Sequence, residues 1–329
     1  MQKPLSEQVI VITGATSGIG LATARHAAGQ GARVVLAARS EGVLQDVVRE
    51  ISDAGGDALG VPTDVGVRAQ VEALAQAAIT RHGRIDTWVN NAGVSLWGRL
   101  DQVSEEDMRK LFETNLWGVV NGSLAALPHL RESRGTLINL GSIASEVAFP
   151  VQGIYAASKH AVKGFTDALR TELLHDRAGV TVTLVKPASI GTPLTRHARN
   201  ITGRAARLPP PVYAPGEVAR VILRAAVHPT REVYVGGAGP MLGAMAALAP
   251  GLFDKLGASA VYSAQLGQAE APQAGNLHAP LSEAQEDGEQ VGWPSLYSRA
   301  ANGPAAPVLA LGLAAAAAIL LTQRRHRRH

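Results

Sequence analysis

The chain has 329 residues, of which 46% are hydrophobic and 18% charged, so it can bury a large core and disorder is not its default state. It contains no cysteine, which excludes disulfide bonds and thiolate metal sites. The net charge of +4 equals the contribution of four arginines within the last six residues, so the rest of the chain is close to neutral. With only 4% aromatic residues, this composition does not indicate a nucleic-acid-binding protein.

The N-terminal residues 1–8 are polar and lead straight into an apolar run. They lack the charged and apolar regions of a secretory signal peptide. We therefore expect the folded body to lie in the cytoplasm.

An apolar run at residues 9–12 predicts a buried parallel strand, and a glycine-rich loop follows it before a helical pattern at residues 21–29. In this loop Gly14 permits a tight turn, Gly18 lets the backbone approach a pyrophosphate, and Gly20 allows close packing of helix on strand. The N-terminus of the helix then faces the phosphates. A glycine-rich loop alone is often only a turn, but strand, loop and helix together predict a dinucleotide site.

The second predicted strand, at residues 32–38, ends without the acidic residue that would bind the ribose hydroxyls of NAD, and Arg39 follows it. We interpret Arg39 as a ligand of a 2′-phosphate, so NADP (NADPH) is the preferred cofactor and NAD remains possible; the alternative is a solvated surface arginine. Asp64 follows a third strand at 57–61. It either contacts the adenine or caps the helix at 67–82.

The remaining elements continue the alternation. Further strands are expected at 85–89, 136–140, 180–185 and 232–235, and further helices at 41–53, 105–112, 115–130, 153–176 and 217–227. This order predicts the α/β class, with a single doubly wound parallel sheet of the Rossmann type and a C-terminal extension. Ligands bind at the carboxyl ends of the strands of such a sheet. The glycine-rich loop, Asp64, residues 90–93, Ser142 and Pro187 all fall at such ends.

Tyr155 and Lys159 lie four residues apart on the predicted helix 153–176 and therefore share one face. A free tyrosine titrates at about pH 10, and a nearby ammonium group favours the phenolate and brings its pKa toward the working range. Ser142 could hold a substrate oxygen against the same phenol. The three side chains together predict proton transfer to and from an alcohol or a carbonyl group.

Taken together, these motifs resemble those of the short-chain dehydrogenase/reductase family over about residues 5–240. The matching residues are Thr13, Gly14, Gly18, Ile19, Gly20, Asn90, Asn91, Ala92, Gly93, Asn115, Ser142, Tyr155, Lys159 and Pro187. Ala188 departs from the pattern, because the family commonly has glycine after this proline. That segment borders the nicotinamide and the substrate, so the substrate itself is not predicted.

The resemblance implies roles for the matching residues. Tyr155 would be the general acid in reduction and the base in oxidation, Lys159 would lower its pKa and hold the nicotinamide ribose, and Ser142 would polarise the substrate carbonyl. Asn115 would anchor a water molecule in a proton relay, and Thr192 would contact the nicotinamide carboxamide. The expected cofactor site, which holds no metal, comprises Gly14, Thr16, Ser17, Gly18, Ile19, Gly20, Arg39, Asp64, Asn91, Ala92, Gly93, Tyr155, Lys159, Pro187 and Thr192.

The leading hypothesis is therefore an NADP-preferring oxidoreductase that interconverts a secondary alcohol and a ketone, with Tyr155 as the general acid/base. The alternative is a membrane-associated, cofactor-binding regulatory or scaffold protein with an idle site. The intact Ser142, Lys159 and Asn115 argue against that alternative, because idle sites tend to lose such groups. An epimerase or dehydratase would need a further acid/base group, which is not evident.

Two features bear on partners. The family implies a homodimer or homotetramer formed through helices 104–131 and 153–176. Residues 190–212, a substrate lid in the family, carry four arginines that could attract an acidic or acyl-carrier substrate or a membrane surface, or could simply face solvent. These arginines are Arg196, Arg199, Arg204 and Arg207.

The expected domain organisation has three parts. Residues 1–257 form the catalytic domain, and apolar residues within 238–257 could cover the substrate pocket or dock on a membrane or a second subunit. Residues 258–304 predict a flexible linker, because they are rich in small residues, Pro, Gln and Glu. Residues 305–329 combine an Ala-rich apolar helix, at the lower length limit for a membrane span, with a basic tail. This tail either spans a membrane, lies on an anionic surface or makes no membrane contact.

Overall fold

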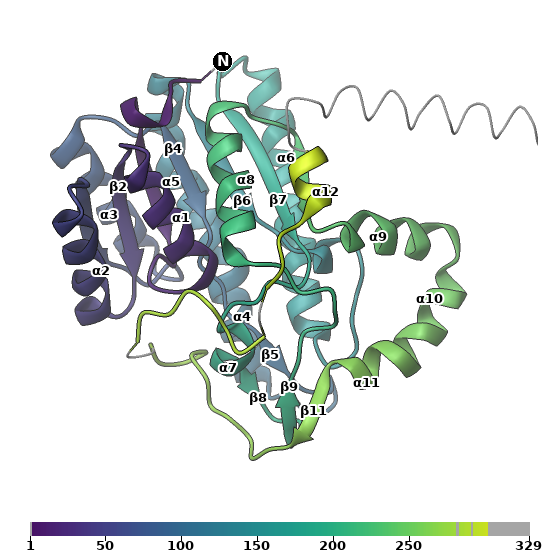
Figure 1. Cartoon of the computed structure of the whole chain (residues 1–329). Helices are drawn as coiled ribbons and strands as arrows, with labels where there is room; N and C mark the ends of the chain where they lie inside the picture. Colours follow the sequence, from purple (N-terminus) through teal and green to yellow (C-terminus); the bar gives the residue numbers. More distant parts are fainter. Residues whose placement is uncertain (1, 281–282, 291, 302–329) are drawn as a thin grey trace, which may run out of the picture.

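The computed structural model of the chain describes residues 2–280, 283–290 and 292–301. Its centre is a seven-stranded, wholly parallel sheet with the order β10-β7-β6-β4-β1-β2-β3 (Figure 1). The strands are β1 (Val9–Thr13), β2 (Arg33–Ala38), β3 (Ala58–Pro62), β4 (Thr87–Asn90), β6 (Thr136–Leu140), β7 (Thr181–Pro187) and β10 (Glu232–Val235). The strand order changes direction between β1 and β4. The predicted α/β class with one doubly wound parallel sheet is confirmed.

Helices cover both faces of this sheet. They are α1 (Gly18–Gly29), α2 (Glu41–Asp53) and α8 (Pro215–Val227) on one face, and α3 (Arg68–His82), α5 (Gly118–Ser133) and α6 (Gly153–His175) on the other. Each helix presents one apolar stripe to the sheet, as in α2, where Val43, Leu44, Val47 and Ile51 are buried.

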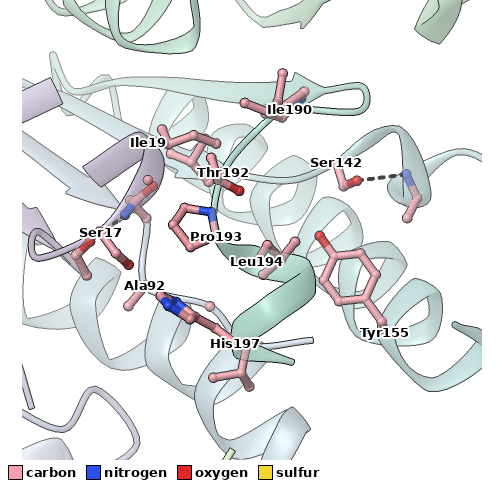
Figure 2. Close-up of a pocket in the computed structure, with 18 of the residues that line it drawn as sticks. Ser17, Ile19, Ala92, Ser142, Tyr155, Ile190, Thr192, Pro193, Leu194 and His197 are labelled. Carbon is pink, nitrogen blue, oxygen red and sulfur yellow. Dashed lines mark hydrogen bonds between the residues drawn. The ribbon is translucent and has the colours of Figure 1, made fainter. Parts of the chain in front are cut away.

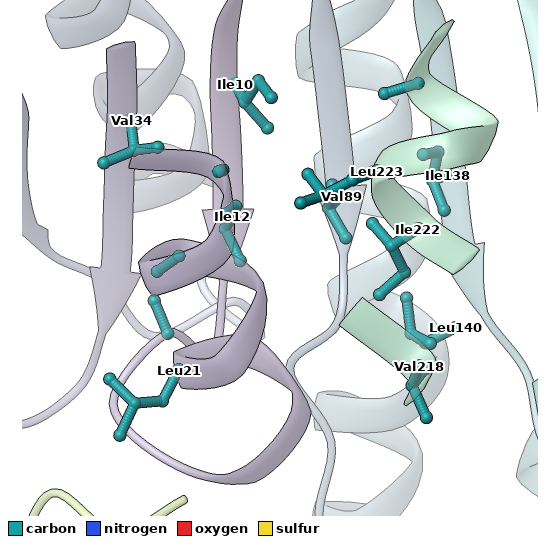
Figure 3. Packing of buried hydrophobic residues seen from close by; sticks show 14 of the residues in the cluster. Ile10, Ile12, Leu21, Val34, Val89, Ile138, Leu140, Val218, Ile222 and Leu223 are labelled. Atoms are coloured by element: carbon teal, nitrogen blue, oxygen red, sulfur yellow. The ribbon is translucent and has the colours of Figure 1, made fainter. Parts of the chain in front are cut away.

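Successive side chains of a strand point to opposite faces, so β1 contributes to two cores. Ile10 and Ile12 pack with α1 and α8, as Figure 3 shows, whereas Val9 and Val11 pack with the helices of the opposite face. All five residues of β1 are buried, which explains why its sequence is a continuous apolar run and not an alternating one. The two cores hold the strands side by side with their carboxyl ends on one edge.

The helix α4 (Glu105–Phe112) is capped by Ser104, whose hydroxyl accepts a hydrogen bond of 3.1 Å from the Asp107 N–H. A π-helical turn, Glu113–Trp117, separates α4 from α5. Asn115 therefore lies in this turn and not in the regular helix that the sequence predicted. Such turns are frequent at functional sites.

The shorter elements lie outside the main sheet. They are 3₁₀ turns at Leu5–Glu7 and Ile143–Ser145, α7 (Leu194–His197), α9 (Ala238–Leu248), α10 (Pro250–Leu256), a π turn at Gly257–Val261, α11 (Tyr262–Ala264), α12 (Leu296–Ala301), and the strands β5 (Leu96–Trp97), β8 (Arg199–Asn200), β9 (Arg204–Ala206) and β11 (Leu266–Ala269). β5 pairs with β8, and β9 pairs with β11. In Figure 1, α9, α10 and α11 extend outward from the body before the chain turns back at β11.

The described part of residues 258–304 differs from the flexible linker that the sequence predicted. After β11 the chain returns along the body, drawn in yellow-green in Figure 1, and Leu277 is fully buried beside Val94 and Leu96. Single anchoring residues make these contacts, so no periodic apolar pattern marks the segment. The apolar tail, 305–329, lies outside the described residues. None of the helices in the described ranges has the length and hydropathy that crossing a membrane requires.

Candidate active site

The carboxyl ends of the central strands open into one cavity of about 420 Å³. The glycine-rich loop after β1 forms one side of it, and Ser142 after β6 and Tyr155 on α6 form another. Figure 2 shows Ser17 and Ile19 on one side of the view and Ser142 and Tyr155 on the other, with Thr192 between them. The cavity lies at the point where the strand order reverses, which is where doubly wound sheets bind their ligands.

The glycine-rich loop is shaped to approach a phosphate group. Gly14 and Gly18 have φ angles of +66° and +50°, which favour glycine. A Cβ atom on Gly14 would lie 2.8 Å from the Ala92 Cα, and one on Gly20 would lie 2.1 Å from the Gly14 carbonyl oxygen. The loop therefore packs directly on the start of α1, whose first N–H groups have no partner within the helix. A bare backbone beside a helix N-terminus fits the diphosphate of a dinucleotide.

Tyr155 and Lys159 lie near the start of α6 and face the cavity together with Ser142. The Lys159 Nζ atom is 5.8 Å from the centroid of the Tyr155 ring and donates a hydrogen bond of 2.9 Å to the Leu140 carbonyl. The Ser142 hydroxyl accepts a hydrogen bond of 3.1 Å from the Ala144 N–H, dashed in Figure 2, and interacts with the Tyr155 phenol in the sense that lowers the pKa of the phenol. A hydroxyl and a phenol thus converge on one point where a substrate oxygen could sit.

The electrostatics of this group differ from the sequence-based expectation. Burial raises the pKa of the Tyr155 phenol, and the nearby Ser142 hydroxyl acts in the opposite direction. The prediction that Lys159 brings the pKa of Tyr155 toward neutrality is therefore not confirmed. The Lys159 ammonium is directed to the Leu140 carbonyl, and burial lowers its own pKa to about 8.

This shift predicts a pH dependence of stability. The pKa of Lys159 is about 8 in the folded chain and 10.5 ordinarily, so the unfolded state binds more protons between these values and stability rises with pH there. We expect Lys159→Met to be more stable than wild type at about pH 7 and to lose most of this advantage as the pH rises to about 10.5, because the folded amine is neutral above its pKa of about 8 and the unfolded amine becomes neutral only above its pKa of 10.5. Urea unfolding of both proteins across this range measures the difference. A constant difference would contradict the shift.

Asn115 is fully buried and does not line the cavity in the described part of the chain. Its side-chain oxygen accepts a hydrogen bond of 2.8 Å from the Val94 N–H, and its amide donates to the Val94 carbonyl and to the Ser158 hydroxyl. It therefore joins the loop after β4 to α6. This geometry positions α6; the predicted role of anchoring a water molecule stays a prediction.

Arg39 and Asp64 lie together at another end of the cavity. Burial lowers the pKa of the Arg39 guanidinium, and the Asp64 carboxylate partly opposes that shift. Asp64 Oδ1 accepts a hydrogen bond of 2.9 Å from the Gly66 N–H, two residues on, whereas the cap position of α3 is Val67. Asp64 thus shapes the turn before α3 and does not cap the helix.

Most predicted site residues line this cavity. Those that do are Gly14, Thr16, Ser17, Gly18, Ile19, Arg39, Asp64, Asn91, Ala92, Gly93, Ser142, Tyr155, Lys159, Pro187 and Thr192. Gly20 is not among them; it packs behind the loop against Gly14 and the Asn91 amide. The Asn91 amide in turn donates to the Thr13 and Gly14 carbonyls, at 2.9 and 3.1 Å.

Sequence reasoning missed a second group of residues that line the cavity. It includes the apolar residues Ile143, Phe149, Leu194, Leu242 and Val261 and the polar residues His197, Asn276 and Glu283. They come from irregular segments and from the C-terminal extension, where no motif marks them. Two signals pointed to this group: the family's lid segment, 190–212, which contains Leu194 and His197, and the apolar residues within 238–257, of which Leu242 lines the pocket. Burial lowers the pKa of His197, which favours the neutral imidazole.

The four arginines of 190–212 do not line the cavity in the described residues. Arg199 pairs with Asp107 at 3.1 Å, and Arg204 donates to the Gly267 carbonyl at 2.8 Å. Arg196 pairs with Glu283 at 3.7 Å. These three arginines bind α4 and the segment from β11 onward. They therefore do not form an anion-binding patch for a substrate.

Comparison with known proteins identifies the family of the chain. The model of the short chain dehydrogenase family matches residues 8–202. The chain belongs to this family. An oxidoreductase of Bacillus subtilis (strain 168), YxnA, is 42% identical over 312 residues, which cover 92% of this chain and 87% of the relative. An oxidoreductase of Methylorubrum extorquens is 36% identical over 200 residues, which cover 60% of this chain and 79% of the relative. The similarity to YxnA thus includes the C-terminal extension.

Solved structures of short-chain dehydrogenases share the fold. One from Burkholderia phymatum, in complex with NAD, has a TM-score of 0.69 at 30% identity and covers 76% of this chain and 96% of its own. A gluconate 5-dehydrogenase from Burkholderia cenocepacia, in complex with NADP and tartrate, has a TM-score of 0.63 at 28% identity and covers 71% of this chain and 96% of its own. This short-chain dehydrogenase is therefore an oxidoreductase built on the same Rossmann-type sheet.

Proposed function

We propose that the chain is an NADP-preferring oxidoreductase that interconverts a secondary alcohol and a ketone. One observation carries this proposal. A single cavity has the glycine-rich loop, whose backbone can approach a phosphate group, on one side and the Ser142 and Tyr155 hydroxyls on another. Solved relatives that bind NAD or NADP support the cofactor class. An idle scaffold is not favoured, because these hydroxyls and Lys159 face the cavity together.

The proposed mechanism assigns proton transfer to the protein and hydride transfer to the nicotinamide, which supplies or accepts the hydride when bound. Tyr155 donates its phenolic proton to the carbonyl oxygen during reduction and removes the hydroxyl proton during oxidation. The Ser142 hydroxyl donates a hydrogen bond to the same oxygen and polarises it. Lys159 would hold the ribose hydroxyls, and the start of α1 would hold the diphosphate.

The proposed preference for NADP rests on Arg39, which is the first residue after β2. Arg39 and Lys159 are the arginine and lysine side chains that line the cavity among the described residues, and Lys159 belongs to the catalytic group. Arg39 is therefore the cation available to a 2′-phosphate. An arginine–phosphate contact is charge-assisted and forms several hydrogen bonds.

Arg39→Ala should weaken NADPH binding by roughly tenfold to a hundredfold and leave NADH binding nearly unchanged, because only the 2′-phosphate loses a partner. Fluorescence titration with both nucleotides measures the two affinities. Arg33→Ala is the matched control, since Arg33 begins the same strand, β2, and does not line the cavity. Equal losses for NADPH and NADH, or a wild-type preference for NADH, would refute the assignment of Arg39.

The substrate end of the cavity indicates an uncharged, apolar alcohol or ketone. Ile143, Phe149 and Leu242 belong to one apolar cluster next to Ser142. The charged residues that line the cavity in the described ranges are Arg39, Asp64, Lys159 and Glu283. The first two lie together away from the catalytic group, Lys159 is part of that group, and Glu283 pairs with Arg196, so a substrate carboxylate would lack a cationic partner.

A screen with NADPH tests the whole proposal. Apolar ketones should be reduced, and matched ketones that carry a carboxylate should react at least about tenfold less well. Reduction of no ketone by a protein that binds NADPH would contradict the reaction, and preference for the carboxylated partner would contradict the substrate class.

We also propose a homodimer or homotetramer that uses the faces of α5 and α6. Trp117 and Leu124 leave 56% and 44% of their surface exposed there, which a partner subunit would cover. Light scattering of the purified chain measures the assembly state, and a monomer at high concentration would contradict this assignment.

A further inference from the structure

The segment after β11 crosses the mouth of the cavity. We call residues 273–280 and 283–290 the C-terminal strap. In Figure 1 it is the yellow-green chain that runs from β11 beneath α1 and then back toward α12. Asn276, Pro280 and Glu283 of the strap line the cavity, so it forms part of the wall.

One side of the strap is bound to the glycine-rich loop. The Gln285 carbonyl accepts a hydrogen bond of 2.8 Å from the Gly18 N–H, at the first turn of α1, and Gln285 forms a β-bridge with Ser17. The Glu286 carboxylate pairs with Arg25 of the same helix at 2.9 Å. The strap carbonyl therefore occupies an N–H group at the place where a diphosphate would bind.

The strap also occupies the guanidinium of Arg39. The carbonyls of Asn276 and Leu277 accept hydrogen bonds from Arg39 at 2.5 and 3.4 Å. Leu277 is fully buried, and His278 contacts the Asp107 carboxylate at 2.7 Å, so this end of the strap is held from both flanks. Two of the five donors of the guanidinium proposed for the 2′-phosphate are thus occupied by backbone carbonyls.

The other side of the strap is bound to the segment after β7. The Asn276 N–H donates to the His197 carbonyl at 2.7 Å, and the Gly288 N–H donates to the Gly191 carbonyl at 2.9 Å. A Cβ atom on Gly288 would lie 2.2 Å from the Thr192 carbonyl oxygen, which shows how closely the two segments pack. The strap therefore connects the glycine-rich loop, on one side of the proposed cofactor cleft, with the segment after β7 on the other side.

We propose that the C-terminal strap is a latch over the cofactor cleft that must open before a dinucleotide can enter or leave. Its carbonyls satisfy the Gly18 N–H and the Arg39 guanidinium while the cleft is closed, and the phosphates of the nucleotide compete for the same donors. Binding then requires an opening step, and the observed association rate reaches a plateau at high nucleotide concentration. This inference rests on the proposed nucleotide function of the cleft.

The first test weakens one anchor outside the cavity. Glu286→Gln removes the carboxylate that pairs with Arg25, and it should raise both the plateau association rate and the release rate of NADPH about two- to fivefold, as expected for a partly exposed ion pair. Glu289→Gln is the matched control, because Glu289 is an exposed glutamate of the same strap that makes no ion pair within the described residues. Stopped-flow fluorescence measures the rates. Unchanged rates in Glu286→Gln, or an association rate that grows linearly with NADPH, would overturn the latch.

The second test locks the strap. Ser17 and Gln285 form a β-bridge. Neighbouring strands lie about 4.8 Å apart, within the range of about 4.4–6.8 Å between the Cα atoms of disulfides, and the natural chain has no cysteine that could compete. The double variant Ser17→Cys/Gln285→Cys should exchange NADPH at least about tenfold more slowly when oxidised than when reduced, and reductant should restore exchange. Equal exchange by both forms would overturn the latch. Failure of the reduced and wild-type proteins to bind NADPH would instead contradict the proposed function.

Discussion

Tyr155→Phe should lower the turnover of the ketone roughly 100- to 10,000-fold, because the phenylalanine ring keeps the shape of the side chain but has no proton to transfer. The Ser142 hydroxyl alone cannot replace this acid, since it would have to give up its proton at a far higher pKa. The affinity for NADPH should stay within about threefold of wild type, because the ring still fills its place on α6. Steady-state kinetics and a nucleotide titration of the same preparation measure both quantities.

The control is Tyr297→Phe, which removes the hydroxyl of a tyrosine that is 40% exposed on α12 and does not line the cavity. This variant should keep wild-type turnover. Near-wild-type turnover in Tyr155→Phe would show that another group supplies the proton. A loss of NADPH affinity as large as the loss of turnover would show that Tyr155 acts in binding.

Gly20→Ala should both destabilise the fold and abolish tight nucleotide binding. The added Cβ atom would lie 2.1 Å from the Gly14 carbonyl oxygen and 2.5 Å from the Asn91 amide nitrogen, and the nearest of these atoms belongs to the backbone of the loop. The start of α1 would have to move away from β1, at a cost of about 1–3 kcal/mol for overpacking. We expect the free energy of unfolding to fall by that amount and the affinity for NADPH to fall at least about tenfold, because the same loop holds the diphosphate.

Gly29→Ala provides a matched control in the same helix. Gly29 is the last residue of α1, and a Cβ atom added there would have no neighbouring atom within 4 Å. Alanine at this position should stabilise the chain by about 0.5–1 kcal/mol and leave NADPH binding unchanged. Denaturant unfolding and nucleotide titration compare the two variants. If Gly20→Ala behaved like Gly29→Ala, close packing at the loop would not matter for the site.

The Tyr155 and Lys159 side chains share a property that only their environment explains. Burial disfavours the charged forms of both Tyr155 and Lys159, so the phenol stays protonated and the ammonium releases its proton more readily than a free lysine. A protonated phenol is the form that donates a proton during reduction. The Tyr155→Phe experiment is therefore best made in the direction of reduction, with a ketone and NADPH.

The sequence alone determined the sheet and the place of the site. Strands buried on both faces must be continuous apolar runs, and helices that cover them must carry one apolar stripe, so both appear in the pattern of residues. Parallel strands bring their carboxyl ends to one edge, which is why Gly14, Asp64 and Ser142 could be assigned to a common site from their positions in the chain. The match of the short-chain dehydrogenase family confirmed the resemblance that these motifs carried.

The tertiary structure decided what lies around those motifs. The sequence left Arg39 as either a solvated surface arginine or a ligand of a phosphate. In the folded chain its partners are the backbone carbonyls of Asn276 and Leu277, more than two hundred residues away in the sequence. The part of the wall that Leu242 of α9 contributes and the strap over the cleft both come from the chain after β10. Backbone carbonyls and single buried side chains make these contacts, and every residue type offers a carbonyl. Such contacts leave no periodicity or spacing in the sequence, and only the path of the folded chain brings them to the site.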